Sequence, residues 1–373
     1  MSYPVALPGN QSDPPFLPRR IYWELTRTCN LRCVHCRAIP IELASPDDLP
    51  THVCLDIMDQ IAEVCQPALV LTGGEPLLRE DVFELAAYGK SRGFRMGLAT
   101  NGTRVTAEVA KQIKEAGFDR IGISIDGPDA ATHDSFRQVP GAFDAAIAGI
   151  HHLKRLGMYV QINTSVTKHN AGQLEAILEL MLRLEIDAWH LFLLVPVGCG
   201  LQIAEKMQVE AEEYERILTW LYEKSKTVMM DLRAVCAPHF LRIRAQHIME
   251  DKKSGIEAQP FIPPGTQAKS SGPAHPTKGC LAGTGMCFIS YKGEIYPCGY
   301  LPVKAGDLKD QTFEEIWASS PVLQSLRDPD LLKGKCGVCE FRHICEGCRA
   351  RAYGMTGDYL AEEPFCLYRP VGA

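Results

Sequence analysis

The sequence lacks the features that would assign it to a membrane or nucleic-acid-binding class. No uninterrupted apolar run approaches the ~18 residues of a membrane-spanning helix, and residues 1–20 lack the apolar core of a secretory signal. Basic residues are not in excess, because 39 Lys and Arg stand against 45 Asp and Glu, which gives a net charge of −6. These absences predict a cytoplasmic protein whose partners include neither nucleic acid nor a membrane.

Cysteine, in contrast, is abundant, with fifteen residues. Without an export signal a disulfide framework is not expected. In a reducing compartment, clustered thiols are better explained as thiolate ligands of zinc or of iron–sulfur clusters. Four of the fifteen cysteines are isolated in the sequence and belong to no cluster, and we interpret them as small buried hydrophobic residues. They are Cys54, Cys65, Cys199 and Cys236.

Residues 20–230 alternate short β-rich runs with helix-length amphipathic stretches. The expected strands are 21–26, 68–72, 94–99, 120–125, 158–167 and 188–195. The expected helices are 52–65, 81–92, 106–116, 143–156 and 173–184, with a further helix at about 208–228. Buried strands that alternate with helices predict a parallel sheet. Six units are too few for an eight-fold barrel, so we expect an α/β fold with a partial (β/α)6 TIM-like barrel.

The flanking segments differ in composition from this repeat. Residues 1–19 are proline-rich and are expected to form an extended tail. Residues 231–275, whose end is polar and rich in proline, are expected to bridge to a second domain. Residues 276–373 are rich in cysteine, glycine and aromatic residues, and 288–298 have the alternation of a β-hairpin. We therefore predict a cysteine-rich C-terminal domain at 276–373.

Three cysteines, Cys29, Cys33 and Cys36, follow the first expected strand with the spacing C-x3-C-x2-C. Three thiolates on a four-iron cluster leave one iron open to an outside ligand. Zinc is the alternative, but it normally needs a fourth protein ligand, and His35 is poorly placed to supply it. Further motifs follow the next three strands, namely TGGEP, TNGT and DGPDAATHDSFR. Because barrels of this kind place their chemistry in the loops after the strands, this coincidence predicts one active site.

The three cysteines, combined with Gly73-Gly74-Glu75-Pro76 after the second strand, resemble the radical S-adenosylmethionine (AdoMet) superfamily. The resemblance implies that Cys29, Cys33 and Cys36 bind a [4Fe–4S] cluster whose open iron chelates AdoMet. It also implies that reductive cleavage releases a 5′-deoxyadenosyl radical, so that no side chain acts as the catalytic acid or base. A histidine replaces the usual aromatic residue before the third cysteine, and imidazole can still stack on adenine. The resemblance places around AdoMet the residues His35, Gly74, Glu75, Asn101, Ser124, Asp126 and Arg137.

Eight more cysteines fall within the last hundred residues, too many for ordinary core positions. Two zinc-ribbon sites are the alternative, because C-x2-C pairs are also zinc signatures. The order of the spacings, with Gly293 five residues before Cys298, resembles the SPASM extension of radical AdoMet enzymes. The resemblance implies one auxiliary [4Fe–4S] cluster on Cys280, Cys287, Cys298 and Cys348. It implies a second auxiliary cluster on Cys336, Cys339, Cys345 and Cys366.

The interval between Cys345 and Cys348 is one residue shorter than is common in that family. The number of auxiliary clusters, one or two, therefore stays open. A cluster with four thiolate ligands has no open iron and is suited to passing electrons. Such a cluster could accept an electron from the substrate, supply one, or stabilise the fold.

Longer segments resemble the enzymes of alternative heme and heme d1 biosynthesis, the group that contains the AdoMet-dependent heme synthases. They include CNLRCVHCRA, WHLFLLVPVG, CAPH, GCLAGTGMCFISYKGEIYPCGYLPV and KCGVCEFRHICEGCRARAYGMTGDYLAEEPFC. The implied reaction, in siroheme-dependent heme biosynthesis, converts Fe-coproporphyrin III to heme b by oxidative decarboxylation of two propionates to vinyl groups. The implied partners are this tetrapyrrole, an electron donor such as ferredoxin or flavodoxin, and an electron acceptor that the sequence does not identify.

A planar substrate that bears four carboxylates needs a wide apolar slot edged with cations. The candidate carboxylate partners near the cysteines are Arg27, Arg32, Arg37, Arg349 and Arg351. The candidate ligands of the porphyrin iron are His190, His239 and His343. Solvated surface positions for the arginines and structural roles for the histidines are the alternatives.

Other functions compete with heme synthesis at this point. They are a SPASM peptide-modifying enzyme, a sister tetrapyrrole enzyme such as a didecarboxysiroheme deacetylase or a heme d1 enzyme, and a non-catalytic iron–sulfur electron carrier. The sequence offers no clear room for a peptide-recognition extension beyond residues 1–19. Formation of 5′-deoxyadenosine from AdoMet would separate an enzyme from an electron carrier.

Overall fold

We analysed a computed structural model, which describes residues 16–38, 45–253 and 279–371. Within these residues, ten strands form one sheet in the order β10-β9-β8-β1-β2-β3-β4-β5-β6-β7. The strands are β1 (Arg20–Glu24), β2 (Ala68–Thr72), β3 (Arg95–Thr100), β4 (Arg120–Ser124), β5 (Val160–Val166), β6 (Ala188–Leu193), β7 (Asp231–Val235), β8 (Met286–Ile289), β9 (Glu294–Tyr296) and β10 (Gly306–Asp307).

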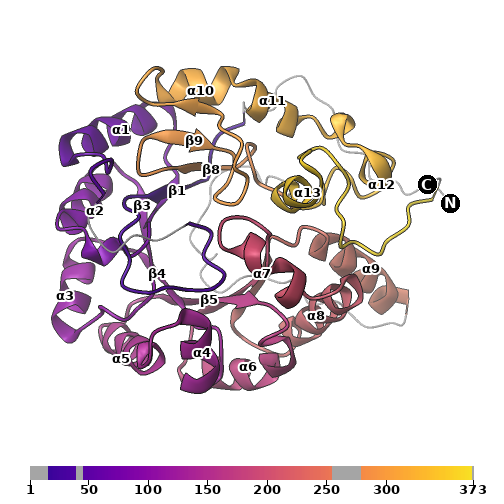
Figure 1. Cartoon of the computed structure of the whole chain (residues 1–373), viewed down its shortest axis with the longest axis horizontal. Helices are drawn as coiled ribbons and strands as arrows, with labels where there is room; N and C mark the ends of the chain where they lie inside the picture. Colours follow the sequence, from indigo (N-terminus) through magenta and orange to yellow (C-terminus); the bar gives the residue numbers. More distant parts are fainter. Residues whose placement is uncertain (1–15, 39–44, 254–278, 372–373) are drawn as a thin grey trace.

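Helices form an outer ring around this sheet, as Figure 1 shows for α1, α2, α3, α5 and α6. In the first part of the chain they are α1 (Thr51–Val64), α2 (Val82–Ser91), α3 (Ala107–Glu115), α4 (Ala130–Arg137), α5 (Ala142–Arg155), α6 (Leu174–Arg183), α7 (Gly200–Met207), α8 (Ala211–Ser225) and α9 (Phe240–Lys253). In the last part they are α10 (Phe313–Ser319), α11 (Pro321–Arg327), α12 (Gly334–Gly337) and α13 (Arg349–Thr356). Short 3₁₀ helices are η1 (Pro76–Leu78), η2 (Ala171–Gln173) and η3 (Pro329–Leu331).

The six strands expected from the sequence are β1–β6, all parallel, and each neighbours the next in the sheet. The α/β partial-barrel fold is therefore confirmed. A seventh parallel strand, β7, was not predicted. It lies in the segment expected to be a bridge and pairs with β6.

Strand β5 illustrates how the sequence sets the two faces of the barrel wall. Val160, Ile162 and Val166 are fully buried and belong to the main hydrophobic core. The residues between them, Gln161 and Asn163 among them, are half-buried and polar. Because side chains alternate along a strand, the apolar set meets the helices and the polar set faces the barrel interior.

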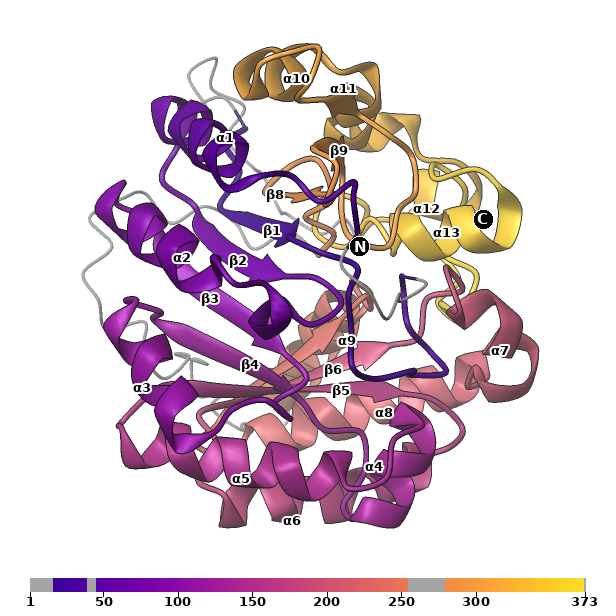
Figure 2. The ribbon, with the colours of Figure 1, turned by 60° about the vertical axis from the view of Figure 1, so that its left-hand side comes forward.

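The cysteine-rich segment continues the same sheet. Strand β8 pairs with β1 in parallel, and β9 and β10 follow in antiparallel order. The predicted hairpin is β8–β9, and Figure 2 shows it beside β1 with the C-terminal helices beyond it. Residues 1–15 of the predicted tail, 254–275 of the predicted bridge and 276–278 of the predicted C-terminal domain lie outside the described residues. No helix in the described ranges is both long and apolar enough to cross a membrane.

Candidate active site

The loop that carries Cys29, Cys33 and Cys36 begins where β1 ends, and the helix α4 supports it. The backbone N–H groups of Arg32 and Val34 donate to carbonyl oxygens at the C-terminal end of α4, at 3.3 and 3.1 Å. All three cysteines are half-buried. Burial raises the pKa of the Cys29 thiol to about 11 and that of the Cys36 thiol to about 12. Thiols in such surroundings become thiolates when a metal centre replaces the proton.

The glycine-rich segment after β2 packs directly on this loop. The N–H groups of Gly74 and Glu75 donate to the carbonyl oxygens of Thr26 and Thr28, both at 2.7 Å. A Cβ atom added at Gly74 would lie 2.3 Å from the carbonyl oxygen of Thr28, and one at Gly73 would lie 2.6 Å from that of Thr26. Only glycine permits an approach this close, so the two segments form one unit.

The Glu75 carboxylate is fully buried and accepts three hydrogen bonds. The donors are the Leu77 N–H at 3.1 Å, the Thr100 hydroxyl at 2.7 Å and the Asn101 N–H at 2.8 Å. Burial raises the pKa of the Glu75 carboxyl, and the hydrogen bonds oppose this shift. The Asn101 side chain donates to Asn30 of the cysteine loop at 2.9 Å. Asn101 therefore anchors the loop rather than pointing freely toward a ligand.

Arg137 and Asp126 form a buried pair behind the cysteine loop. Arg137 Nη2 lies 2.5 Å from Asp126 Oδ2, and Arg137 Nη1 lies 3.4 Å from the Cys33 sulfur. The second Asp126 oxygen accepts from the Ser165 N–H at 2.7 Å. Burial opposes ionisation of Asp126, but the charge of Arg137 keeps its pKa below the usual value. Ser124 is the last residue of β4, two residues before Asp126, and is half-buried. The arginine thus holds a cluster cysteine, a contact that its predicted role toward AdoMet did not include.

His35 stacks face to face on Phe136, with ring centroids 4.2 Å apart, and Phe136 in turn stacks on His169 at 5.5 Å. The sequence did not indicate this three-ring stack, because its members come from distant segments. Burial, followed by the charge of Arg137, lowers the pKa of His35 to about 3. The ring is therefore neutral, and its Nδ1 is shielded from solvent with no hydrogen-bond partner in the protein. A neutral, stacked ring with an unused polar atom fits the predicted contact with a nucleotide base.

The predicted second auxiliary group surrounds a small cavity of about 20 Å³ near the C-terminus. Its four cysteines, Cys336, Cys339, Cys345 and Cys366, all line this cavity. Three of the sulfurs accept hydrogen bonds from the protein. The donors are the Glu363 N–H at 3.3 Å, the Phe341 N–H at 3.4 Å and Arg242 Nη2 at 3.6 Å. Such N–H···S contacts and an arginine favour an anionic thiolate cluster, so the donor set fits the expected group.

The structure places the three candidate iron-ligating histidines apart. His239 is fully buried at the cavity just described, and neither ring nitrogen has a hydrogen-bond partner. His190 lies on β6, where burial and then Arg120 and Arg233 hold its pKa well below the ordinary value. His343 is exposed. They do not form one site.

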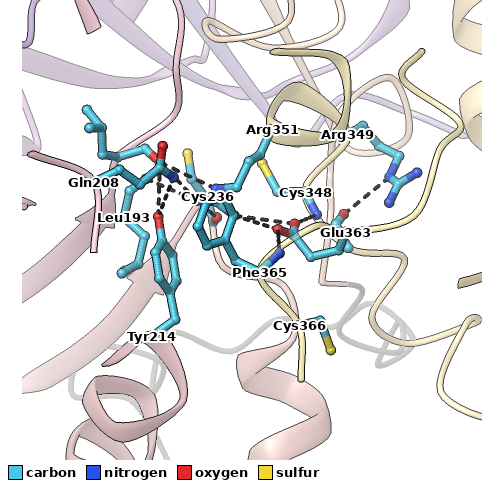
Figure 3. Close-up of polar contacts among 12 residues, drawn as sticks. Leu193, Gln208, Tyr214, Cys236, Cys348, Arg349, Arg351, Glu363, Phe365 and Cys366 are labelled. Carbon is cyan, nitrogen blue, oxygen red and sulfur yellow. Dashed lines mark hydrogen bonds and ion pairs between the residues drawn. The ribbon is translucent and has the colours of Figure 1, made fainter. Parts of the chain in front are cut away.

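The candidate carboxylate partners also separate. Arg349 and Arg351 are fully buried and bind groups of the protein itself. Arg349 donates to the carbonyl oxygens of Tyr359 and Ala361, at 3.0 and 2.7 Å. Arg351 pairs with buried Glu363, with Nη1 3.2 Å from Oε1 (Figure 3). These two arginines are shielded from solvent and bind the protein itself, so the structure lends no support to their predicted contact with substrate carboxylates.

The arginines around the first cysteine loop are more accessible. Arg37 Nη2 lies 2.5 Å from a Glu24 carboxylate oxygen, and its guanidinium lies over the Phe288 ring at 4.3 Å. Arg27 donates to the Tyr291 hydroxyl at 3.4 Å and is half-buried. Arg32 is exposed. Arg37 thus contacts both a strand of the barrel and the β8–β9 hairpin.

The predicted first auxiliary group is only partly assembled. Cys280, Cys298 and Cys348 lie within electrostatic reach of one another. The structure does not bring Cys287 to them, because it is fully buried in the main core. Cys236, which we interpreted as an isolated hydrophobic residue, instead packs in one small cluster with Cys348 and interacts with it electrostatically. Among the residues that the structure describes, no three His, Cys, Asp or Glu side chains converge as they would around a single metal ion.

A partial α/β barrel whose first strand is followed by a loop with three cysteines is typical of a cluster-dependent enzyme. Comparisons with known proteins support this class. Residues 23–181 match the Radical SAM superfamily, and residues 280–349 match SPASM, an iron–sulfur cluster-binding domain. The AdoMet-dependent heme synthase of Methanosarcina barkeri is 48% identical, over 95% of this chain and 97% of its own. The pre-heme d1 synthase of Dinoroseobacter shibae is 34% identical, over 93% and 85%.

The chain therefore belongs to the radical SAM superfamily, and its close homologues there are AdoMet-dependent heme synthases. It is an enzyme whose cofactors are AdoMet with a [4Fe–4S] cluster and auxiliary iron–sulfur clusters. Among solved structures, Streptococcus suis SuiB bound to S-adenosylmethionine has a TM-score of 0.72. It covers 95% of this chain and 78% of SuiB at 16% identity, a likeness of fold alone.

Proposed function

We propose that this enzyme converts Fe-coproporphyrin III to heme b by oxidative decarboxylation of two propionates to vinyl groups. The observation that carries the proposal is the difference in identity to two relatives. The chain is 48% identical to an AdoMet-dependent heme synthase but 34% identical to a pre-heme d1 synthase, at nearly equal coverage of this chain. The closer similarity to the heme synthase favours its reaction over that of a sister enzyme.

When bound, AdoMet and its cluster supply a 5′-deoxyadenosyl radical, which takes one hydrogen atom from the β-carbon of a propionate. The carboxylate then leaves as CO2, one electron passes to an acceptor, and a vinyl group remains. Each propionate consumes one AdoMet. We propose an auxiliary cluster as the first electron acceptor, and a ferredoxin or flavodoxin as the electron donor. The compartment would be the cytoplasm, where thiolates stay reduced.

The protein contributes to this reaction by fixing the position of the loop that carries Cys29, Cys33 and Cys36. Arg137 ties Cys33 to buried Asp126, and the backbone of Cys199 donates to the Cys36 carbonyl oxygen at 2.9 Å. A Cβ atom at Gly198 would lie 1.9 Å from the carbonyl oxygen of the residue after Cys36. The loops after β1, β4 and β6 are therefore in tight contact, which fixes the cysteine loop for hydrogen-atom abstraction at one carbon.

We propose that the porphyrin lies between the first cysteine loop and the β8–β9 hairpin. Arg37 offers a guanidinium there, 24% exposed, beside the Phe288 ring. Tyr300 lies within electrostatic reach of both Arg37 and Cys36. Aromatic faces beside a cation suit an apolar macrocycle that carries carboxylates. The Arg37 side chain would have to exchange Glu24 for a propionate.

The test uses the anaerobically reconstituted full chain with AdoMet, dithionite and Fe-coproporphyrin III. The expected result is two successive mass losses from the porphyrin, each of one CO2 and two hydrogen atoms, of which one is abstracted by the radical and the other is the carboxyl proton, with one 5′-deoxyadenosine formed for each. The matched control replaces Cys29, Cys33 and Cys36 by alanine and should form neither product.

Two outcomes would reject the proposal in different ways. Formation of 5′-deoxyadenosine without any change in porphyrin mass would show that the substrate is wrong, and didecarboxysiroheme and a precursor peptide would then be tried. No 5′-deoxyadenosine at all would leave the electron-carrier hypothesis. Replacement of Arg37 by methionine should raise the KM for Fe-coproporphyrin III while 5′-deoxyadenosine formation without substrate stays unchanged.

A further inference from the structure

The first auxiliary cluster has a different fourth ligand from the one that cysteine spacing indicates. We propose that Cys236 completes this site together with Cys280, Cys298 and Cys348, and that Cys287 is not a ligand. The inference rests on the presence of a SPASM domain and not on the identity of the substrate. Three observations carry it, namely the direction of Cys287, the contacts of Cys236 and the backbone conformation at Cys236.

Cys287 points away from the other cysteines because of its place in β8. Its backbone is paired with Ile21 of β1, and its side chain belongs to the main core. Its electrostatic neighbours are Cys65 and Arg327, on the helix side of the sheet. The next residue, Phe288, faces the opposite way and lies under the Arg37 guanidinium. Since side chains alternate along a strand, no rotation of the Cys287 side chain would bring its sulfur to the interior face.

Cys236 occupies the position that Cys287 leaves unfilled. It directly follows β7, and its side chain packs in one cluster with Cys348, its strongest electrostatic neighbour. Cys298 is its next electrostatic neighbour, and Cys280 interacts with Cys348 and Cys298 in turn. Cys236, Cys298 and Cys348 also share a small hydrophobic cluster that is separate from the main core, where Cys287 lies. The four cysteines Cys236, Cys280, Cys298 and Cys348 therefore lie in one region of the fold, from which Cys287 is absent.

The backbone at Cys236 is unusual for a cysteine. Its φ is +58°, in the left-handed region that glycine and asparagine favour, and it is one of four non-glycine residues with a positive φ in the described part of the chain. Buried Arg351 holds the conformation by donating from Nη2 to the Cys236 carbonyl oxygen at 2.7 Å, as Figure 3 shows. Strained backbone of this kind persists where the side chain has a function. A cysteine with only a packing role would have no need of it.

The surroundings of the four sulfurs suit thiolates of a cluster. The backbone N–H groups of Ala282 and Arg349 lie near the Cys280 sulfur, and those of Tyr300 and Leu301 lie near the Cys298 sulfur. These backbone donors and the positive charge of nearby Arg351 stabilise negative charge on sulfur. With four thiolates the cluster has no open iron, so it is suited to accept electrons rather than to bind the substrate. Three thiolates alone would have left an open iron.

The test compares Cys236 variants with Cys287 variants in the full chain, purified and reconstituted anaerobically. Cys236→Gly removes the sulfur and suits the positive φ, so the fold is retained, and Cys236→Ala is the second variant. Both should lose about four iron atoms per chain, or keep the iron with an altered EPR spectrum of the reduced protein. Cys287→Ala and Cys287→Val should keep the wild-type iron content and spectrum.

Formation of 5′-deoxyadenosine in every variant serves as the control, because it depends on the separate loop of Cys29, Cys33 and Cys36. Unchanged iron and an unchanged EPR spectrum in Cys236→Gly would overturn the proposal. Loss of four iron atoms in both Cys287 variants would overturn it as well. If the wild-type enzyme failed to convert the porphyrin, the iron counts would still decide the ligand, so the two proposals fail separately.

Discussion

Replacement of Arg351 by methionine should destabilise the protein by about 3–5 kcal/mol, the usual cost of breaking a buried ion pair from one side. The Arg351 and Glu363 side chains are 0% and 1% exposed. Without the guanidinium, the buried Glu363 carboxylate loses its ion-pair partner and its largest favourable charge interaction. The carbonyl oxygens of Leu193, Leu194 and Cys236 lose their donor at the same time. The barrel end of β6 and the C-terminal segment are held together by this one side chain.

The measurement is urea unfolding of the anaerobically purified protein, followed by tryptophan fluorescence. A lower midpoint at constant slope reports a loss of stability alone. The control is Lys333→Met, which removes an ion pair with Asp358 whose side chains are 62% and 37% exposed. Because solvent screens such a pair, its loss should cost less than about 1 kcal/mol.

The double variant Arg351→Met with Glu363→Gln separates charge from packing. It removes the uncompensated carboxylate and keeps an oxygen for the Cys348 N–H, which donates to Glu363 at 2.7 Å. It should therefore be more stable than the single variant, and recover more than half of the loss. A loss below about 1 kcal/mol in the single variant, or no recovery in the double, would refute this reasoning.

Further predictions concern the AdoMet site and pH. Gly74→Ala puts a Cβ atom 2.3 Å from the Thr28 carbonyl oxygen and should reduce the affinity for AdoMet at least tenfold in equilibrium dialysis. The control Gly172→Ala, which has open space around its Cβ atom, should bind AdoMet as the wild type does. Equal affinities of the two variants would show that the clash at Gly74 does not affect binding. Glu75→Gln should weaken AdoMet binding about 10–100-fold, because a hydrogen bond to a charged group is worth about 1.5–3 kcal/mol. The control is Glu84→Gln, at an exposed position, which should leave the affinity unchanged. A loss of affinity under threefold in Glu75→Gln would contradict the predicted contact with AdoMet. Burial lowers the pKa of His133 from 6.5 to about 4, so the unfolded chain takes up the proton first and stability falls as pH drops through this range. The expected loss is about 2 kcal/mol by pH 5, and an unchanged pH slope in His133→Gln would argue against it.

The sequence was sufficient for the barrel because its signals are local. Strands such as 120–124 and 160–166 are short apolar or alternating runs between amphipathic helices, and both were predicted within two residues. Strand β7, at 231–235, was missed because DLRAV carries two charges and follows no repeat. Its assignment depends on pairing with β6, which is a tertiary contact.

The cysteine groups show where spacing is informative and where it is not. Cys336, Cys339 and Cys345 lie close in sequence, so their common cavity could be predicted. Cys236 is separated from the rest by a helix and a long polar segment, and no spacing marks it. For Cys287 a signal was available. It lies one residue before Phe288 in an alternating run, so the two had to face opposite sides of the sheet.

The loop that carries Cys36 lies close to the segment that carries Cys298, and this proximity bears on the direction of electron flow. Cys298 is followed by Gly299, whose Cβ position is 3.6 Å from Arg37 Cδ, and Arg37 is the neighbour of Cys36. Tyr300 interacts electrostatically with Cys36 on one side and Cys298 on the other. Because one continuous sheet carries both regions, this spacing is fixed by backbone pairing rather than by mobile loops. For the substrate position proposed above, between the two regions, an electron left on the substrate would have a short route to the first auxiliary site.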